Sequence, residues 1–241
     1  MRLKPPFPFS VVIRNVFVDY DNTLHDSDSK FIAQFEAPAS KLGLTGRELW
    51  KLYLFEVHRD IVHRWYPEKH DDREFHCRLI FQKLGKPYSE GLALQLISAF
   101  ERAMEECWRN PTFFPETFLF LEEVSKRYRV CLATSENALQ KASSLERMGG
   151  RKYFACVLGD HNIGIRKTEK EYYLRALELT EARAEESVMV GDSTTHDIQP
   201  ASEVGMKTIW VNRRGEVFSG KRDCEVRDLK EALRCLDHHL F

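Results

Sequence analysis

The sequence predicts an α/β fold, a Rossmann-like parallel sheet with helices on both faces, together with an inserted all-helical domain. Three observations lead to this fold class. Short, nearly continuous apolar runs recur along the chain, as is typical of strands buried on both faces. From residue 117 onward these runs alternate with segments of helical periodicity. Between the first two runs lies a long stretch without a convincing strand.

The strands are predicted from apolar runs that are rich in β-branched residues. These runs span residues 15–20, 128–135, 153–160, 186–193 and 206–213. Helical periodicity predicts helices over residues 117–127, 136–149, 168–182, 196–204 and 227–239. Strands that alternate with helices are joined by right-handed crossovers, so the strands are expected to lie parallel.

The stretch from residue 28 to 110 interrupts this alternation. Its pattern indicates helices over roughly residues 28–42, 45–66, 71–85 and 88–109, separated by turn signals. The predicted domains are therefore an α/β core (1–25 and 112–241) and a helical cap (26–111). An insertion at the carboxyl end of a strand sits above the edge where open α/β sheets bind ligands. We expect it to act as a lid, with hinges near residues 25–27 and 110–115.

Composition excludes several classes of function. With 36 Lys and Arg against 37 Asp and Glu, the chain has no overall field for a nucleic-acid polymer or an anionic membrane. No apolar run approaches the ~18 residues that span a bilayer. The proline-rich start, "MRLKPPFPF", is expected to be a leader into the first strand rather than a secretion signal. The six cysteines form no CxxC pair, which favours reduced thiols in a cytoplasmic protein over zinc or disulfide sites.

Acidic residues follow two of the predicted strands. In "RNVFVDYDNTLHD", Asp19 and Asp21 lie one residue apart where the first strand ends. In "VMVGDSTTHDI", Asp192 follows a strand in the same way, and Asp197 lies on the first turn of the next helix. Gly191 is expected to allow a tight backbone turn. Taken singly, these acids are equally explained by polar turns or by favourable charge at a helix N-terminus.

Two further segments indicate an anion site. Thr134 and Ser135 lie in "ATSEN", where the second strand gives way to a helix expected to begin near Glu136. Hydroxyls and free backbone N–H groups at a helix start bind anions, although a plain helix cap uses the same residues. Lys167 follows a glycine-containing loop and precedes a helix, so its ammonium can reach back to the strand ends. A solvated lysine is the simple alternative.

The carboxyl ends of all strands in a parallel sheet lie on one edge, so these side chains are expected to meet. At an effective dielectric constant of about 20, two carboxylates ~4 Å apart repel by roughly 4 kcal/mol. Such crowding is expected to require either protonation or a bound cation, and hard oxygen ligands favour Mg²⁺ as the cation. Acids with a divalent metal, next to a lysine and hydroxyl groups, are typical of phosphoryl transfer.

The order and strand context of these motifs resemble the haloacid dehalogenase (HAD) superfamily, from about residue 14 to residue 236. The segment "DYDNTL" resembles the DxDxT motif of the superfamily, and "ATSEN" resembles its Thr/Ser motif. Lys167 matches the motif lysine, and "GDSTTHD" resembles the GDxxxxD acids. The helical insertion after the first motif resembles a C1 cap.

This resemblance implies roles for the individual residues. Asp19 would be the nucleophile that forms an aspartyl-phosphate, and Asp21 would protonate the leaving oxygen and then deprotonate water. The implied ligands of Mg²⁺ are Asp19, Asp21 through its backbone carbonyl, Asp192 and, directly or through water, Asp197. The implied phosphate-binding residues are Asn22, Thr134, Ser135 and Lys167. Dehalogenases and phosphonatases of the superfamily lack an acid at the position of Asp21, so phosphate-ester chemistry is favoured.

The expected function is a Mg²⁺-dependent phosphatase of small phosphorylated metabolites. Asn22 replaces a glycine often found in the first motif, a variant associated with nucleotidase-like and sugar-phosphate-phosphatase-like members. Glu136 adds an acid near the anion site, and "RKTEKE" lacks the prolines of the usual "KPDP". A phosphomutase with the same residues and a non-catalytic, metal-binding phospho-acceptor module are the alternatives.

The insertion contains one chemically unusual segment, "VHRDIVHRWYPEKH", at residues 57–70. His58 and Arg59 recur as His63 and Arg64 about one helical turn later, and two aromatic residues follow. The segment is interpreted as a surface that supplies cationic and stacking groups to the substrate. Alternatively, it is a solvated helix face whose aromatic side chains pack inside the insertion.

Overall fold

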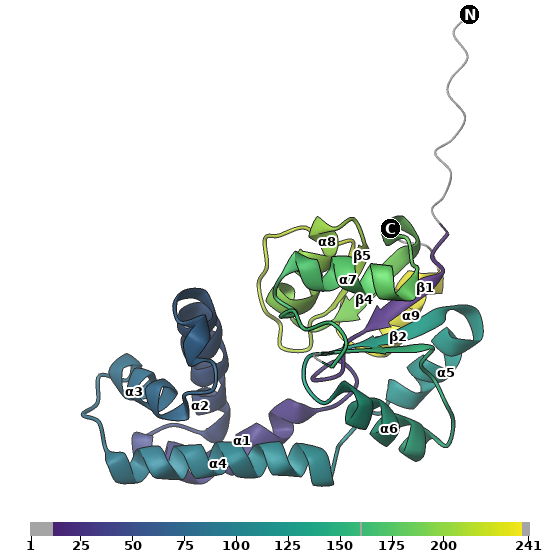
Figure 1. The fold of residues 1–241 in the computed structure, drawn as a ribbon. Coiled ribbons are helices and arrows are strands. Elements are labelled where there is room, and N and C mark those ends of the chain that lie inside the picture. Colours follow the sequence, from purple (N-terminus) through teal and green to yellow (C-terminus); the bar gives the residue numbers. More distant parts are fainter. Residues whose placement is uncertain (1–11, 160, 238–241) are drawn as a thin grey trace, which may run out of the picture. The chain divides into compact units, whose positions relative to one another are not determined.

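A computed structural model describes residues 12–159 and 161–237 (Figure 1). Its contacts separate into two compact units. The sheet unit consists of the described residues up to His25 and from Phe113 onward, and the helical unit is Asp26–Thr112. The naming of these units as catalytic core and cap, and the action of the helical unit as a lid, stay predictions.

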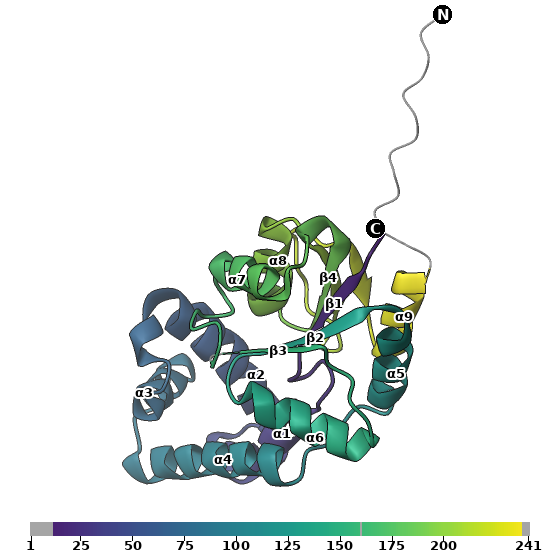
Figure 2. The same ribbon diagram turned by 45° about the vertical axis from the view of Figure 1, so that its right-hand side comes forward.

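The sheet unit is built on a parallel sheet, which confirms the predicted fold class. Within the described residues the sheet has six strands, in the order β3-β2-β1-β4-β5-β6 (Figure 2). Their bounds are β1 Asn15–Val18, β2 Arg129–Ala133, β3 Cys156–Leu158, β4 Ser187–Gly191, β5 Lys207–Val211 and β6 Cys224–Val226. The first five lie within the predicted apolar runs. The sequence pattern missed β6 because three residues are too few to show a period.

The sheet is covered by helices on both faces. The helices are α5 Thr117–Arg127, α6 Ala138–Gly149, α7 Lys170–Thr180, α8 Gln199–Glu203 and α9 Leu229–Asp237. Val16 and Val18 of the central strand β1 belong to a core cluster with α5, α6 and α9. Phe17, which points to the other face, packs in a cluster with α7 and α8. Both faces of the strands are therefore apolar, which explains their continuous hydrophobic runs.

Three ends of predicted elements differ from the structure or lie outside it. Helix α6 begins at Ala138 rather than near Glu136, because Asn137 adopts a left-handed conformation (φ 56°) just before it. The helix expected over residues 196–204 starts as a π-helical turn, Thr194–Ile198, and continues as α8. The predicted leader at residues 1–11 and the last two residues of the helix expected at 227–239 lie outside the described residues.

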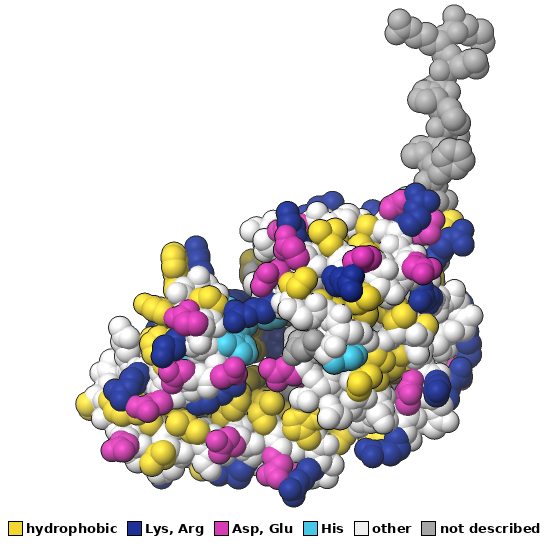
Figure 3. Space-filling model, in the orientation of Figure 1, with side chains coloured by type: hydrophobic (Ala, Val, Ile, Leu, Met, Phe, Trp, Pro, Cys, Tyr) yellow, Lys and Arg dark blue, Asp and Glu magenta, His cyan; other side chains and the backbone are white. Residues whose placement is uncertain are grey.

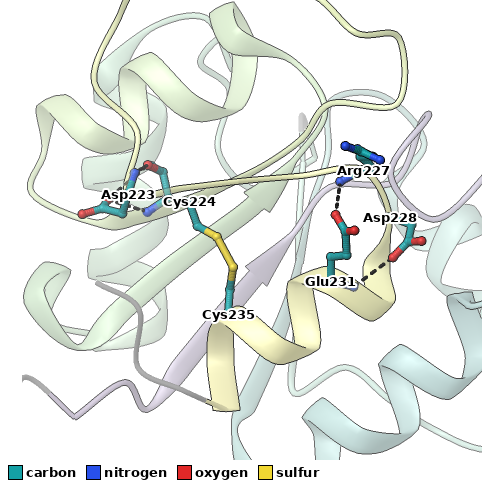
Figure 4. The surroundings of a disulfide bond; sticks show 7 residues. Asp223, Cys224, Arg227, Asp228, Glu231 and Cys235 are labelled. Carbon is teal, nitrogen blue, oxygen red and sulfur yellow. Dashed lines mark hydrogen bonds between the residues drawn. A yellow bond between two sulfur atoms is a disulfide. The ribbon is translucent and has the colours of Figure 1, made fainter.

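The expectation of reduced thiols is wrong for two of the six cysteines. Cys224 of β6 and Cys235 of α9 form a disulfide (Figure 4). The bond joins the edge strand to the helix that follows it, and Glu231 in the first turn of this helix accepts a hydrogen bond from the backbone N–H of Arg227. The cysteines at positions 77, 107, 131 and 156 are not part of this disulfide. Sequence spacing failed here because the two partners lie eleven positions apart without any motif.

The helical unit has its own apolar core. Its elements are α1 Ser27–Leu42, α2 Gly46–Lys51, a π-helix Leu52–His63, a 3₁₀ turn Pro67–Lys69, α3 Arg73–Lys83 and α4 Glu90–Arg109. Phe31 stacks on Trp50 with ring centroids 4.3 Å apart, and Trp50 in turn stacks on Tyr53. Side-chain caps begin several helices, including a capping box formed by Thr45 and Glu48 at α2. No described helix combines the length and the apolar character needed to cross a membrane.

Two aromatic residues at the end of the histidine-rich segment point outward. Trp65 is 65% exposed and Tyr66 is 44% exposed. The expected packing inside the insertion is therefore wrong for Trp65, whereas the ring of Tyr66 contacts that of Phe75 edge-on. That the segment is a solvated helix face stays a prediction. Contact of the segment with a substrate stays a prediction.

The chain enters and leaves the helical unit at neighbouring points. Within the sheet unit, His25 forms an antiparallel bridge with Phe113, and the N–H of Phe114 donates to the carbonyl of Leu24 at 3.1 Å. Within the helical unit, the N–H of Asp26 donates to the carbonyl of Thr112 at 2.8 Å. The two chain segments that join the units are thus held together by backbone hydrogen bonds, one set within each unit.

Candidate active site

Three carboxylates gather at the carboxyl edge of the sheet. Asp19 follows β1, Asp192 follows β4, and Asp197 lies in the π-helical turn after β4. All three residues are buried, and one oxygen of each lies within 4.8 Å of the others. The central position of β1 next to β4 produces this arrangement, because Val18 and Val190 are partners in register.

Lys167 is buried between two of these acids. Its ammonium lies 2.5 Å from Oδ1 of Asp19 and 2.6 Å from Oδ1 of Asp197. Burial acts to lower the pKa of Lys167, but the two carboxylates outweigh it and raise this pKa well above its ordinary value. The lysine therefore remains charged. Two tyrosines of the following helix α7 are anchored nearby, with the hydroxyl of Tyr172 on the carbonyl of Thr134 and that of Tyr173 on the carbonyl of His196.

Asp19 is much less exposed than Asp21, the other acid that directly follows β1. Burial raises its pKa to about 6; the charges of Asp197 and Asp21 add to this shift, and Lys167 opposes it. Its other oxygen accepts a long hydrogen bond, 3.3 Å, from the hydroxyl of Thr23. At neutral pH most Asp19 side chains are therefore carboxylates, held in place on the rigid end of β1.

Gly191 is required for a different reason than the one expected. It is not among the described glycines with positive φ, so no left-handed turn explains it. A Cβ atom at this position would lie only 2.3 Å from the carboxyl carbon of Asp197. The missing side chain thus lets Asp197 approach the end of β4, where its Oδ2 accepts the N–H of Ser193 at 2.9 Å. The predicted tight turn at Gly191 is wrong.

Asp21 points to a second lysine, which the sequence did not indicate. Lys141 of α6 is buried, and its ammonium donates to Oδ2 of Asp21 at 2.8 Å and to Oγ1 of Thr134 at 3.0 Å. His25 contacts the other oxygen of Asp21 at 3.3 Å. Desolvation acts to raise the pKa of the half-exposed Asp21 carboxyl, but Lys141 and His25 outweigh it and lower this pKa well below its ordinary range.

The remaining predicted phosphate-binding residues take different positions. Thr134 is buried directly after β2, where Lys141 contacts its hydroxyl, whereas Ser135 is half-buried and Glu136 is exposed. Neither Thr134 nor Ser135 caps α6, because Asn137 occupies that position. Asn22 has φ 55°, a left-handed conformation that asparagine tolerates better than most residues, which accounts for asparagine where glycine is common.

Arg214 is a third cation that contacts an acid at the carboxyl edge of the sheet. Its guanidinium donates to Oδ2 of Asp192 at 2.6 Å. Lys141, Lys167 and Arg214 therefore each contact at least one of the acids, and their positive charges offset part of the repulsion between the carboxylates. Arg214 was detectable in principle, because it follows the end of β5 at the same edge of the sheet. Lys141 carried no such signal, since it lies inside a helix.

The chain belongs to the haloacid dehalogenase-like hydrolases. The model of this family matches residues 16–211, which include Asp19, Asp21, Asp192 and Asp197. The match confirms the resemblance that the motifs indicated. The matched region contains β2 to β5 and all of β1 except Asn15.

Several proteins of similar sequence are phosphatases. The N-acylneuraminate-9-phosphatase of Rattus norvegicus is 28% identical over 235 residues, covering 85% of this chain and 85% of the relative. The glyceraldehyde 3-phosphate phosphatase of Methanothermobacter thermautotrophicus is 25% identical over 219 residues, covering 88% and 90%. The HAD-hydrolase YfnB of Bacillus subtilis, solved with bound magnesium, has the same fold, with a TM-score of 0.69 at 20% identity over 94% of this chain and 99% of its own.

Replacing Gly191 by alanine should loosen the buried acid cluster. The new methyl group must displace the Asp197 carboxyl, and we expect the free energy of unfolding to fall by about 1–3 kcal/mol, the usual cost of overpacking. Urea denaturation measures this change. Gly91→Ala is the matched control, because nothing lies within 4 Å of a Cβ there and the residue is helical. Equal unfolding midpoints for both variants would contradict the steric role of Gly191.

Proposed function

We propose that this protein is a Mg²⁺-dependent phosphatase that hydrolyses small phosphorylated metabolites through an aspartyl-phosphate intermediate. The observation that carries this proposal is the buried carboxylate of Asp19, held 2.5 Å from Lys167 with Asp192 and Asp197 beside it. Membership of the hydrolase family and the phosphatase names of the relatives support the reaction type.

The donor set fits a hard divalent cation. Carboxylate oxygens of three buried aspartates within 4.8 Å of one another are the ligands that Mg²⁺ prefers. We assign Asp19, Asp192 and the backbone carbonyl of Asp21 as ligands. Asp197 is not assigned as a direct ligand, because Lys167 and the N–H of Ser193 already contact its two oxygens. When bound, Mg²⁺ supplies positive charge to the phosphoryl oxygens and brings the substrate to Asp19.

Asp19 acts as the nucleophile. Its carboxylate attacks phosphorus in line, the bond from phosphorus to the ester oxygen breaks, and the phosphoryl group becomes attached to Asp19. Lys167 and Thr134 hold the phosphoryl oxygens and offset the charge that develops on them. Water then attacks phosphorus, which releases inorganic phosphate and restores the carboxylate.

Asp21 transfers the protons of the leaving oxygen and of the attacking water, and Lys141 stabilises its charged form. With Lys141 at 2.8 Å, Asp21 is held as a carboxylate, the form that accepts a proton from the attacking water. Protonation of the leaving oxygen requires Asp21 to carry a proton first. Because Lys141 also contacts Thr134, a phosphoryl group bound there draws the ammonium away from Asp21 and favours that protonated form.

The names of the relatives indicate a broad class of substrates. Two of them are named for a sugar acid phosphate and a triose phosphate, so phosphomonoesters of small, polar metabolites are the proposed class. A phosphomutase would use the same residues but return the phosphoryl group to its substrate. Release of inorganic phosphate without an isomeric product distinguishes the phosphatase.

A phosphate-release screen tests the proposed function directly. The purified protein is assayed on N-acylneuraminate 9-phosphate, glyceraldehyde 3-phosphate, nucleotides, sugar phosphates and organic acid phosphates. We expect Mg²⁺-dependent release that stops with excess EDTA and is abolished in Asp19→Asn, because an amide is not a nucleophile. Asp237→Asn, which alters only a surface ion pair with Arg127, should retain activity. Full turnover in EDTA would exclude the metal, and an active Asp19→Asn enzyme would exclude the intermediate.

Asp21→Asn separates acid catalysis from nucleophilic attack. Alkyl phosphates need a proton on the leaving oxygen, so their turnover should fall by about 10²–10⁴-fold. p-Nitrophenyl phosphate releases a more stable phenolate, and the burst of p-nitrophenol in the first turnover should be reduced much less. Rapid-mixing measurements compare the two. An equal loss in the first turnover of both substrates would contradict the role of Asp21 as general acid.

Lys141→Met tests the residue that the sequence did not indicate. Losing this ammonium should reduce kcat/KM by roughly 10²-fold or more, as is usual when one donor to a developing anion is removed. It should also weaken inhibition by inorganic phosphate. Lys152→Met, at an exposed position of the same unit, is the matched control and should behave as the wild type. Unchanged phosphate inhibition in folded Lys141→Met would refute the assignment.

A further inference from the structure

Three histidines of the helical unit form a cluster that the proposed reaction does not use. His58 and His63 come from the π-helix, and His70 directly follows the 3₁₀ turn Pro67–Lys69. One ring nitrogen of each lies within 4.8 Å of the other two, and all three residues are half-buried. Figure 3 shows histidine side chains, in cyan, at the surface of the helical unit.

The π-helix itself brings two of these rings together. In a π-helix the backbone hydrogen bonds join residues five apart, so His58 and His63 lie on one face. Their ring centroids are 4.2 Å apart. In an α-helix of 3.6 residues per turn, a spacing of five would point the two side chains in clearly different directions. Single π-helical segments occur frequently at functional sites.

Neighbouring groups hold the third ring and limit the cluster to three members. Nε2 of His63 lies 3.0 Å from Nδ1 of His70, and Arg73 fixes the backbone of His70 by donating to its carbonyl at 2.8 Å. His76 lies close by, but it is committed elsewhere. Its Nδ1 contacts the hydroxyl of Tyr53 and its Nε2 contacts the carbonyl of Lys69.

We propose that His58, His63 and His70 bind a divalent transition-metal ion of the Zn²⁺ type. Nitrogens at about 2.0–2.1 Å from a tetrahedral zinc are separated from each other by roughly 3.3 Å. The separation of 3.0 Å between His63 and His70 is already close to that value. Even the longest separation allowed by the cluster, 4.8 Å, closes with a movement of about 1.5 Å, within the reach of small side-chain rotations.

The chemistry of the donors separates this site from the acid cluster of the sheet unit. Imidazole nitrogens suit zinc, copper, nickel and iron, whereas Mg²⁺ and Ca²⁺ require oxygen ligands. Among the nearby cations, Arg59 pairs with Asp60, Lys69 pairs with Asp72, and Arg73 donates to the carbonyl of His70. Three protein ligands leave a fourth position, which water fills. The bound ion ties the π-helix to the turn before α3.

Zinc titration of the full chain tests this site. Calorimetry is performed with Zn²⁺ in an excess of Mg²⁺, which occupies the acid cluster. We expect one equivalent of zinc to bind and to raise the midpoint of thermal unfolding. His63→Phe and His70→Phe keep a ring but remove its nitrogens, and each should weaken zinc binding at least about tenfold. His161→Phe, which alters an exposed histidine of the sheet unit, is the matched control and should bind zinc like the wild type.

Two further measurements make the result decisive. Zinc X-ray absorption of the wild-type protein should show three imidazole nitrogens at about 2.0 Å. This readout does not depend on the folding of any variant, and coordination by oxygen alone would overturn the proposal. Asp192→Asn should leave the zinc affinity unchanged. Loss of zinc binding in this variant, with binding retained in His63→Phe, would assign the ion to the acid cluster instead. Neither outcome bears on phosphate release, so this proposal and the proposed function can fail separately.

Discussion

The burial of one lysine between two aspartates sets the constraint on which the edge of the sheet depends. Lys167 contacts Asp19 and Asp197, and all three are almost completely shielded from water. Breaking a buried ion pair by removing one partner usually costs about 3–5 kcal/mol, because an uncompensated charge is left in the protein interior. One local feature that fits this constraint is Gly191, whose missing side chain leaves room for the Asp197 carboxyl. The two tyrosines of α7 bind backbone carbonyls nearby.

The parts of the molecule that repeat with a regular period were predictable from the sequence. Strands such as β1 and β4 are apolar on both faces, and the helices between them show the period of an amphipathic surface. A parallel sheet collects its strand ends on one edge, so the neighbourhood of Asp19 and Asp192 followed from topology without any knowledge of contacts. The position of Lys167, in the loop before α7, was predictable for the same reason.

The features that the sequence could not show depend on side-chain direction or on irregular backbone. Lys141 of α6 contacts Asp21, and the helix begins two residues later than its pattern indicates, after a left-handed Asn137. His58 and His63 share a face only in a π-helix, and no propensity rule distinguishes that helix from an α-helix. The disulfide between β6 and α9 joins a strand too short to detect with a helix whose position depends on the whole fold.

The paired crossings between the two units have an evolutionary consequence. The backbone bridge of His25 with Phe113 closes the sheet unit just before the boundary, and the bond from Asp26 to Thr112 closes the helical unit just after it. Each of these backbone hydrogen bonds joins residues of the same unit. The 87 residues of Asp26–Thr112 therefore form a cassette that can be lengthened, shortened or exchanged while the register of β1 and its neighbours is preserved. Selection can thus alter the helical unit without rebuilding the sheet unit.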